Sequence, residues 1–185
     1  LWSSNFAPYE HQYQCWDTLL NGKTEDGKPM SICVTTGTGS GKTECFMMPL
    51  VHDLDKKNIS GEVQAIFLYP LNALMEDQKT RLEELLKGTN LTYAVYNGDL
   101  PESEPSPTDN SEEAKRLRRQ IALIRGEYEE NGETKYRFPK ILYTRKMVRA
   151  KRPNILLTNP TMLEYILLRG TDSKLIDPEK KSLKW

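Results

Sequence analysis

Apolar residues follow two alternating patterns along the chain, short continuous runs and longer stretches with helical spacing. Continuous runs predict buried strands, and they occupy residues 31–35, 63–69, 92–96 and 155–158, with a shorter run at 141–143. Apolar residues at intervals of three and four predict an amphipathic helix over 71–87. Further helices are expected at residues 8–20, 44–53, 112–125 and 161–168. Strands that alternate with helices favour an α/β fold with a parallel sheet, in which ligands bind at the carboxyl ends of the strands.

Between residues 100 and 140 this alternation is interrupted. A Pro/Ser-rich, acidic segment at 100–110 precedes a charged helix, and Asn131-Gly132 predicts the turn of a hairpin within 127–137. Another hairpin-like loop is expected at 21–29, where two glycines lie among polar residues. Because 185 residues suit one domain with a sizeable core, we interpret 100–140 as a charged insert on the sheet rather than a second domain.

The formal net charge is zero, but the charges are unevenly distributed. Residues 111–152 hold 13 Lys and Arg against 6 Glu and no Asp. Such a local excess can neutralise nucleic-acid phosphates. A first cluster fits a solvated helix face equally well: Lys115, Arg116, Arg118 and Arg119. A second cluster favours nucleic acid because it leads into a predicted buried strand: Arg145, Lys146, Arg149, Lys151 and Arg152.

The three cysteines, Cys15, Cys33 and Cys45, show no C-x-x-C spacing, and the two histidines are far apart in the sequence. We therefore predict buried, reduced thiols, no metal site within the chain, and a cytoplasmic protein. No run approaches the ~18 apolar residues of a membrane helix, and no secretory signal opens the chain. Because the chain begins on Leu1 and stops on Trp185, we expect it to be part of a longer protein.

The segment Thr36–Thr43, T-G-T-G-S-G-K-T, lies between a predicted strand and a predicted helix. This context is typical of a phosphate-binding loop. Glycines let backbone N–H groups curl around an anion, and the helix N-terminus adds partial positive charge. We expect Lys42 to reach the β- and γ-phosphates of ATP and the hydroxyl of Thr43 to hold Mg²⁺. The alternative, a Gly/Ser/Thr-rich turn with a chance lysine, fits less well because both flanking elements agree.

One residue departs from the usual pattern of this loop, since Thr36 stands where G-x-x-x-x-G-K-[ST] expects its first glycine. The residues predicted to contact the nucleotide here are Thr36, Gly37, Thr38, Gly39, Ser40, Gly41, Lys42, Thr43 and Glu44.

Four stretches of the chain resemble, in the same order, motifs of superfamily 2 helicases of the DEAD/DEAH type. The first is Phe6-Ala-Pro-Tyr-Glu-His-Gln12, which resembles their Q motif and lies ahead of the phosphate loop, their motif I. The resemblance implies that the Gln12 amide pairs with adenine, because an amide offers both a donor and an acceptor. An ordinary glutamine on a helix surface is the alternative. Phe6 or Tyr9 would stack on the base or belong to the core.

The other two strong resemblances are strand-to-helix corners. Tyr69–Gln78 resembles motif Ia, and Pro153–Tyr165 resembles motif Ib and its strand, with Asn-Pro in place of the commoner Thr-Pro. Helix N-termini at such corners suit phosphates. The turn Asn97-Gly98-Asp99 is a weaker match to a glycine turn near the nucleic acid. Together with the second basic cluster, these motifs predict the following nucleic-acid contacts: Pro70, Leu71, Asn72, Gly98, Arg149, Arg152, Thr158, Asn159, Pro160 and Thr161.

The resemblance implies that residues 1–185 form the front part of a first RecA-like, ATP-binding motor domain. The acidic motif II is not found in the sequence and would follow Trp185, so we expect the chain alone not to hydrolyse ATP and to expose apolar edges such as 63–69. The full-length protein would carry a second RecA-like domain, use ATP and Mg²⁺, and act on nucleic acid, with DNA favoured.

The motif wording is closest to bacterial helicases of DNA repair and phage defence, which implies partner proteins from those systems. Two alternatives stay open. The first is a duplex-DNA translocase subunit of a restriction or defence system, and the second is a nucleic-acid-binding module that no longer hydrolyses ATP.

Overall fold

The computed structural model describes residues 7–176. Its helices are α1 (Glu10–Asn21), α2 (Lys42–Lys57), α3 (Asn72–Leu85), α4 (Glu112–Arg125), α5 (Arg145–Lys151), α6 (Pro160–Leu168) and the 3₁₀ helix η1 (Ser173–Leu175). Its strands are β1 (Ala65–Leu68), β2 (Tyr93–Tyr96), β3 (Glu127–Glu130), β4 (Glu133–Tyr136) and β5 (Ile155–Thr158).

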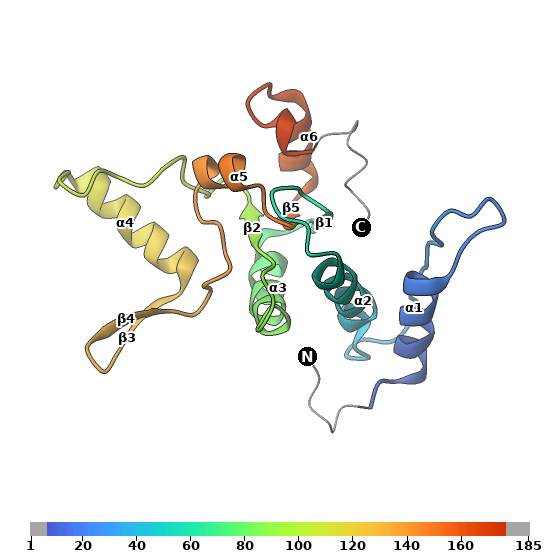
Figure 1. Ribbon diagram of the computed structural model, residues 1–185. Helices are drawn as coiled ribbons and strands as arrows, with labels where there is room; N and C mark the ends of the chain where they lie inside the picture. Colours follow the sequence, from blue (N-terminus) through green and yellow to red (C-terminus); the bar gives the residue numbers. More distant parts are fainter. Residues whose placement is uncertain (1–6, 177–185) are drawn as a thin grey trace.

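The centre of the molecule is a parallel sheet in the order β1-β5-β2 (Figure 1). Ala65 and Tyr93 both pair with Ile155, so the three strands start level and their carboxyl ends meet at one edge. Every residue of β5 is buried. A strand covered on both faces needs apolar side chains on both faces, which explains the continuous sequence I-L-L. The predicted α/β fold with a parallel sheet is confirmed.

Helices cover both faces of this sheet. On one face, the alternate residues Ala65, Phe67, Tyr93, Val95, Ile155 and Leu157 pack with residues of α2 and α3. On the other face, Ala94, Tyr96 and Leu156 pack with residues of α5 and α6. Figure 1 shows α2 and α3 below the sheet and α5 and α6 above it. Each buried leucine-sized side chain stabilises this arrangement by about 1.5–3 kcal/mol, and the layers fix where the strand ends and helix N-termini meet.

Most of the predicted elements are confirmed, but two strands are not. Residues 31–35 form no strand, and their side chains alternate between exposed and half-buried. A strand exists through its hydrogen-bonded neighbours, and none of the described residues pairs with this segment. The run at 141–143 is reduced to a single parallel bridge between Ile141 and Tyr93.

Among the described residues, β1 pairs along one edge only, with β5. Within the stretch 63–69, where an exposed apolar edge was expected, Leu68 is half exposed and Val63 is buried. The rings of Phe67 and Tyr69, on either side of Leu68 in the sequence, pack edge to face with their centroids 6.4 Å apart.

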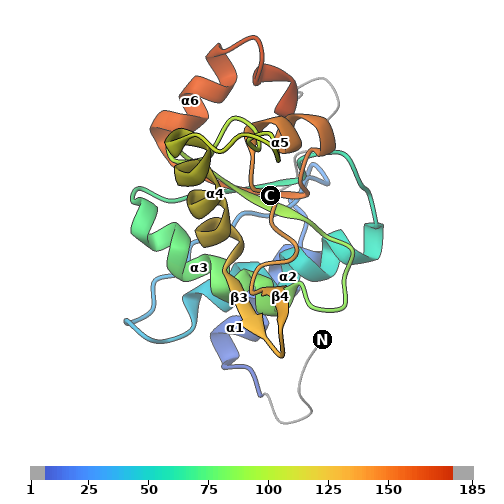
Figure 2. The ribbon, with the colours of Figure 1, turned by 90° about the vertical axis from the view of Figure 1, so that its left-hand side faces the viewer.

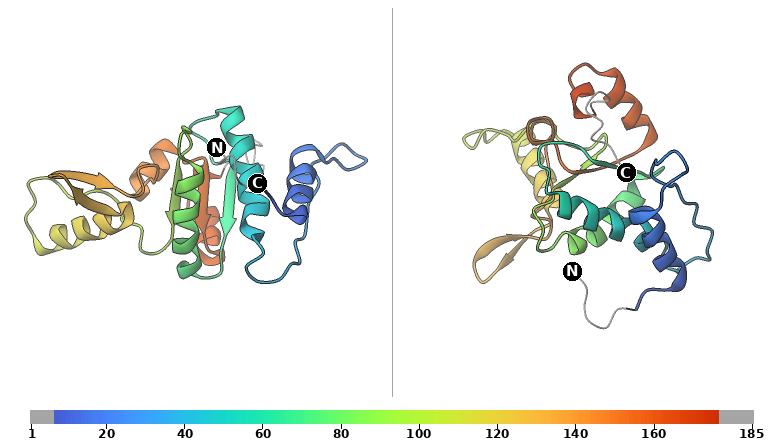
Figure 3. Two further views of the ribbon diagram at one scale, coloured as in Figure 1. Left: turned by 90° about the horizontal axis from the view of Figure 1, so that it is seen from below. Right: turned by 45° about the vertical axis from the view of Figure 1, so that its right-hand side comes forward.

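The predicted insert extends from the side of the sheet at β2, whereas α1 lies at the opposite side of the molecule (Figures 1 and 3). Figure 2, seen from the insert side, shows α4 leading into the β3–β4 hairpin. Asn131 and Gly132 form the turn with φ values of 54° and 78°, as tight hairpins require. The predicted helix and hairpin are therefore confirmed. Bonds such as Lys140 Nζ to the Thr89 carbonyl tie the insert's base to the sheet layers.

Candidate functional site

The phosphate loop is a tight turn that leads into α2. Gly39 and Gly41 have φ values of 76° and 75°, a left-handed conformation that side chains disfavour. Within the turn, the hydroxyl groups of Thr36 and Ser40 lie 2.6 Å apart and share a hydrogen bond. Gly41 is the N-cap of α2, so the unpaired N–H groups of the first helical turn lie beside the loop.

Lys42 crosses this loop. Its Nζ donates hydrogen bonds to the carbonyl oxygens of Thr36 at 2.8 Å and Gly37 at 2.6 Å. The ammonium group is thus held over the loop at the N-terminus of a helix, where an anion is favoured. Thr43 follows in the first turn of α2, and its hydroxyl oxygen is the hard ligand that Mg²⁺ prefers. These residues fit a magnesium-bound nucleoside triphosphate.

The helix α1 contacts the phosphate loop through the side chains of two of its residues. Gln12 is only 2% exposed; its Oε1 accepts from Tyr9 N at 2.9 Å, and its Nε2 donates to the Gly41 carbonyl at 3.1 Å. His11 Nε2 lies 2.9 Å from the Ser40 carbonyl, which requires the tautomer that donates from this nitrogen. Gln12 is therefore not an ordinary surface residue. Its pairing with adenine stays a prediction, since the amide already bonds to the loop.

The two aromatic candidates for base stacking differ. Tyr9 is 64% exposed and stacks on the His11 ring with centroids 5.7 Å apart. The ring of Tyr9 is thus a surface feature rather than part of the core, as stacking on a base requires. Phe6 lies outside the described residues.

A cavity of about 490 Å³ joins these elements, and its lining comes from three parts of the chain: Ala7, Tyr9, Gln12, Gly39, Gly41, Lys42, Thr43, Glu44, Gln78 and Arg81. Seven of these ten residues were predicted to contact the nucleotide. Ala7 and Gln78 lie within the quoted motifs without having been assigned to the nucleotide, and Arg81 lies outside the motifs. Gln78 and Arg81 lie one turn apart on α3, and Arg81 Nη1 is 3.2 Å from Glu44 Oε1. For Arg81, the sequence signal was its i, i+3 spacing from Gln78, the last residue of the motif Ia stretch.

The two predicted corners lie side by side at the carboxyl ends of the strands. Tyr69 N donates to the Thr158 carbonyl at 2.9 Å, which continues the pairing of β1 with β5. Asn159 caps α6 by accepting from Met162 N at 2.8 Å, and its Nδ2 donates to Asn72 Oδ1 at 3.2 Å. The structure thus brings the N-termini of α3 and α6 together, with Pro160 in the first turn of α6. Pro70, Leu71, Asn72, Pro160 and Thr161 are exposed there.

The prediction for the Thr158 hydroxyl is wrong. Thr158 is completely buried, and its Oγ1 donates to the Tyr96 carbonyl at 2.8 Å. Its side chain stabilises the end of the sheet and is not available to a phosphate. Gly98 is exposed in the turn that follows β2, at the same edge of the sheet, so its predicted place near the corners agrees with the fold.

Comparison with known proteins agrees with this geometry. Residues 9–130, which span the phosphate loop and the α3 corner, match the model of the DEAD/DEAH box helicase family. The chain belongs to the DEAD/DEAH box helicase family.

The segments that match this helicase domain are short parts of much longer relatives. It is 35% identical over 98 residues to the Druantia protein DruE of Escherichia coli (strain UMEA 4076-1), a match covering 49% of this chain and 5% of DruE. It is 31% identical over 93 residues to the uncharacterized ATP-dependent helicase YprA of Bacillus subtilis, covering 49% of the chain and 11% of YprA. The ATP-dependent helicase hrq1 of Schizosaccharomyces pombe is 30% identical over 97 residues, covering 50% and 8%.

Among solved structures, the DUF1998 helicase MrfA bound to DNA aligns with a TM-score of 0.54 and 24% identity, covering 91% of this chain and 17% of that chain. This likeness shows the helicase fold. No helix among the described residues of the domain is long and apolar enough to cross a membrane.

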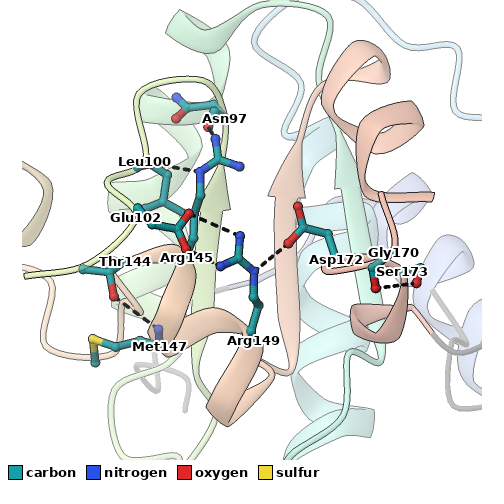
Figure 4. A network of polar contacts seen from close by, with 10 residues as sticks. All are labelled: Asn97, Leu100, Glu102, Thr144, Arg145, Met147, Arg149, Gly170, Asp172 and Ser173. Atoms are coloured by element: carbon teal, nitrogen blue, oxygen red, sulfur yellow. Dashed lines mark hydrogen bonds and ion pairs between the residues drawn. The ribbon is translucent and has the colours of Figure 1, made fainter. Parts of the chain in front are cut away.

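Arg149 of this helicase domain has a different role from the one predicted. Its Nε donates to Asp172 Oδ1 at 2.7 Å, and its Nη1 and Nη2 bond to the Glu102 carboxylate, with Nη2 at 3.3 Å from Oε2 (Figure 4). Hydrogen bonds to these carboxylates, with that to Glu102 the largest contribution, raise the pKa of the Arg149 guanidinium. Asp172 is buried. Arg149 is therefore a partly buried, ion-paired cation that joins the segment after β2 to the segment after α6, rather than a free charge for nucleic acid.

Arg152 precedes the amino end of β5, whereas the two corners lie at the carboxyl ends of the strands. α5 begins near the carboxyl end of β2, where Arg145 Nη2 bonds to the Asn97 carbonyl at 2.9 Å. α5 then leads to Arg152, which lies three residues before Ile155, the first residue of β5. The contact of Arg152 with nucleic acid stays a prediction.

Replacing Arg149 by methionine is expected to destabilise the domain by about 3 kcal/mol, because Asp172 would keep a buried carboxylate without its cation. Chemical denaturation measures this loss. Removing both charges, with Arg149→Met and Asp172→Asn together, is expected to recover part of it. The salt dependence of nucleic-acid binding should not change, because the guanidinium is already neutralised. An Arg149→Met variant as stable as the wild type would contradict a stabilising role for the Arg149–Asp172 ion pair.

The cysteines are less uniformly buried than predicted. Cys45 is buried, Cys15 is half-buried and Cys33 is exposed. Burial raises the pKa of the Cys45 thiol to about 11, so this thiol stays protonated at neutral pH. The exposure of Cys33 follows from the missing strand at 31–35, because nothing among the described residues covers that segment as a sheet neighbour would.

Proposed function

We propose that the full-length protein is an ATP-driven helicase that acts on DNA, and that this chain is the front part of its first motor domain. The observation that carries the proposal is the cavity at the N-terminus of α2, which is lined by the loop lysine, Lys42, the buried Gln12 and the exposed Tyr9. Because the matched segment covers only 5–11% of the relatives' lengths, the activity of the whole protein is a proposal.

In this proposal each residue of the loop has one task. The backbone N–H groups from Gly37 to Thr43 surround the phosphates, and Lys42 leaves its carbonyl partners to neutralise the β- and γ-phosphates. The Thr43 hydroxyl would hold Mg²⁺, which would supply positive charge to the phosphates. Gln12 keeps α1 against the loop, so that Tyr9 lies where an adenine ring can stack.

The nucleic-acid face is formed by the corners at the carboxyl ends of the strands. Phosphates of one strand would lie against the N-termini of α3 and α6, where Asn72 and Thr161 are exposed. The Asn72–Asn159 bond keeps the two N-termini in register, and the Gly98 turn lies on the same edge. A helix N-terminus accepts phosphates of any sequence, which suits a motor that moves along its substrate.

The preference for DNA rests on two supports. The motif wording favours DNA-repair and phage-defence helicases, and the structure of MrfA, similar over 91% of this chain, holds DNA. Relatives of the domain also include an ATP-dependent RNA helicase, DBP6 of Candida albicans, which is 35% identical over 69 residues. We further propose a second RecA-like domain in the same protein, partners from repair or defence systems, and a cytoplasmic location.

Displacement assays on the full-length protein separate this proposal from its two alternatives. A helicase is expected to release a labelled strand from a DNA duplex with a single-stranded tail, and to do so only with ATP. A duplex translocase would displace the third strand of a triplex while leaving the duplex intact. A nucleic-acid-binding module would do neither and would hydrolyse no ATP. Release from RNA duplexes but not from DNA duplexes would contradict the preference for DNA.

A further inference from the structure

Arg81 is a cation of the nucleotide cavity that no motif identifies. It comes from α3, as Gln78 does, whereas the other cavity residues come from the phosphate loop and its helix and from the segment at α1. The Arg81 side chain is 55% exposed. It therefore lines the same cavity as Lys42 while keeping access to solvent.

Glu44 fixes the direction of this guanidinium. Arg81 Nη1 lies 3.2 Å from Glu44 Oε1, and Glu44 directly follows Thr43 on α2. An exposed ion pair of this kind contributes little to folding stability. A guanidinium has five N–H donors in a planar fork, and the bond from Arg81 to Glu44 uses one nitrogen, Nη1. The remaining donors are available to a ligand in the cavity that Arg81 lines.

Two acceptors beside Arg81 also lack partners. Glu44 Oε2 and Gln78 Oε1 are buried, and neither has a hydrogen-bond partner among the described residues. The carboxylate lies against the loop, because a Cβ built on Gly41 would be 3.2 Å from Glu44 Oε2. Buried acceptors are normally satisfied. A wall that offers cationic donors and unsatisfied acceptors matches a nucleotide, whose phosphates accept and whose ribose hydroxyl groups donate hydrogen bonds.

We propose that Arg81 is a nucleotide-binding residue that contacts the phosphate groups of ATP, and that Glu44 is the residue that positions it. The inference rests on the proposed function, since it requires that the cavity binds ATP. It assigns a task to the middle of α3, the helix whose N-terminus forms one of the two nucleic-acid corners. Arg81 supplies a second positive charge beside Lys42, from an element outside the phosphate loop.

The test is a titration of the full-length protein with a non-hydrolysable ATP analogue and, in parallel, with adenosine. Arg81→Met is expected to weaken ATP-analogue binding about tenfold, the usual loss for a charge-assisted hydrogen bond, and to leave adenosine binding unchanged. Arg81→Lys should recover part of the loss because it restores the charge. Glu44→Ala should give a smaller loss, since Arg81 stays but is no longer held. Arg116→Met, which removes an exposed guanidinium from α4, is the matched control.

Melting temperatures of the same variants complete the design. Wild-type affinity in Arg81→Met, together with an equal fall in melting temperature for Arg81→Met and Glu44→Ala, would overturn the inference and leave a structural ion pair. Equal weakening of ATP-analogue and adenosine binding would also overturn it, because the contact would then not be to phosphate. A wild-type protein that binds no ATP analogue, and is unaffected by Lys42→Ala, would instead overturn the proposed function itself.

Discussion

Lys42→Ala in the full-length protein is expected to lower ATP turnover by about a hundredfold or more and to leave the fold intact. The reason is the position of the ammonium group, which lies over the phosphate loop and, within residues 7–176, donates hydrogen bonds to the carbonyl groups of Thr36 and Gly37. Its charge serves an anion rather than the core. Steady-state ATP turnover, measured with and without nucleic acid, checks the prediction.

The control for this variant is Lys56→Ala, which removes an exposed lysine from the last turn of the same helix. It should keep wild-type turnover. Turnover by Lys42→Ala within a few-fold of the wild type, at an unchanged melting temperature, would show that this loop is not the site of ATP hydrolysis.

Gly41→Ala is expected to separate the loop from α1 and to remove both nucleotide binding and part of the stability. An alanine Cβ would lie 2.3 Å from Gln12 Nε2, so the bond between Gln12 and the Gly41 carbonyl could not persist. The residue also has a φ of 75°, and a side chain in this region costs about 1–3 kcal/mol. Thermal denaturation and ATP-analogue titration measure the two effects.

A matched variant separates this steric effect from the general effect of replacing a glycine. Gly170→Ala adds a Cβ with no atom within 4 Å and at a φ outside the left-handed region, so it should change neither stability nor binding. Gly41→Ala with wild-type stability and affinity would mean that the contact between Gln12 and the loop is not required.

Much of the fold follows from local sequence pattern. The strands β1, β2 and β5 are continuous apolar runs, and a parallel sheet covered by helices on both faces needs such runs. The helix α4 has the predicted bounds; in the structure Ser111 caps it and Gly126 ends it in a left-handed conformation. Residues 31–35 have the same apolar character and still form no strand. Local character permits a strand, but pairing decides it.

The candidate site likewise has parts that local sequence predicts and parts that depend on contacts between distant segments. The phosphate loop was predictable because its chemistry lies within eight consecutive residues. The role of Arg149 was not, because its carboxylate partners lie 47 and 23 residues away in the sequence. Arg81 and Glu44 are 37 residues apart, so their pairing depends on how α3 packs against α2. Contacts between residues so far apart in the sequence are determined by the fold and cannot be predicted from residue spacing.

The most direct test of the motor assignment is the rate of ATP turnover by the wild-type full-length protein, with and without single-stranded DNA. The proposal requires that one domain binds nucleic acid at the corners joined by Asn72 and Asn159 and binds ATP at the Lys42 loop. It therefore predicts that single-stranded DNA raises the rate several-fold, and more than RNA of the same length does. A rate that stays the same with DNA and with RNA, or no turnover under any of these conditions, would contradict it.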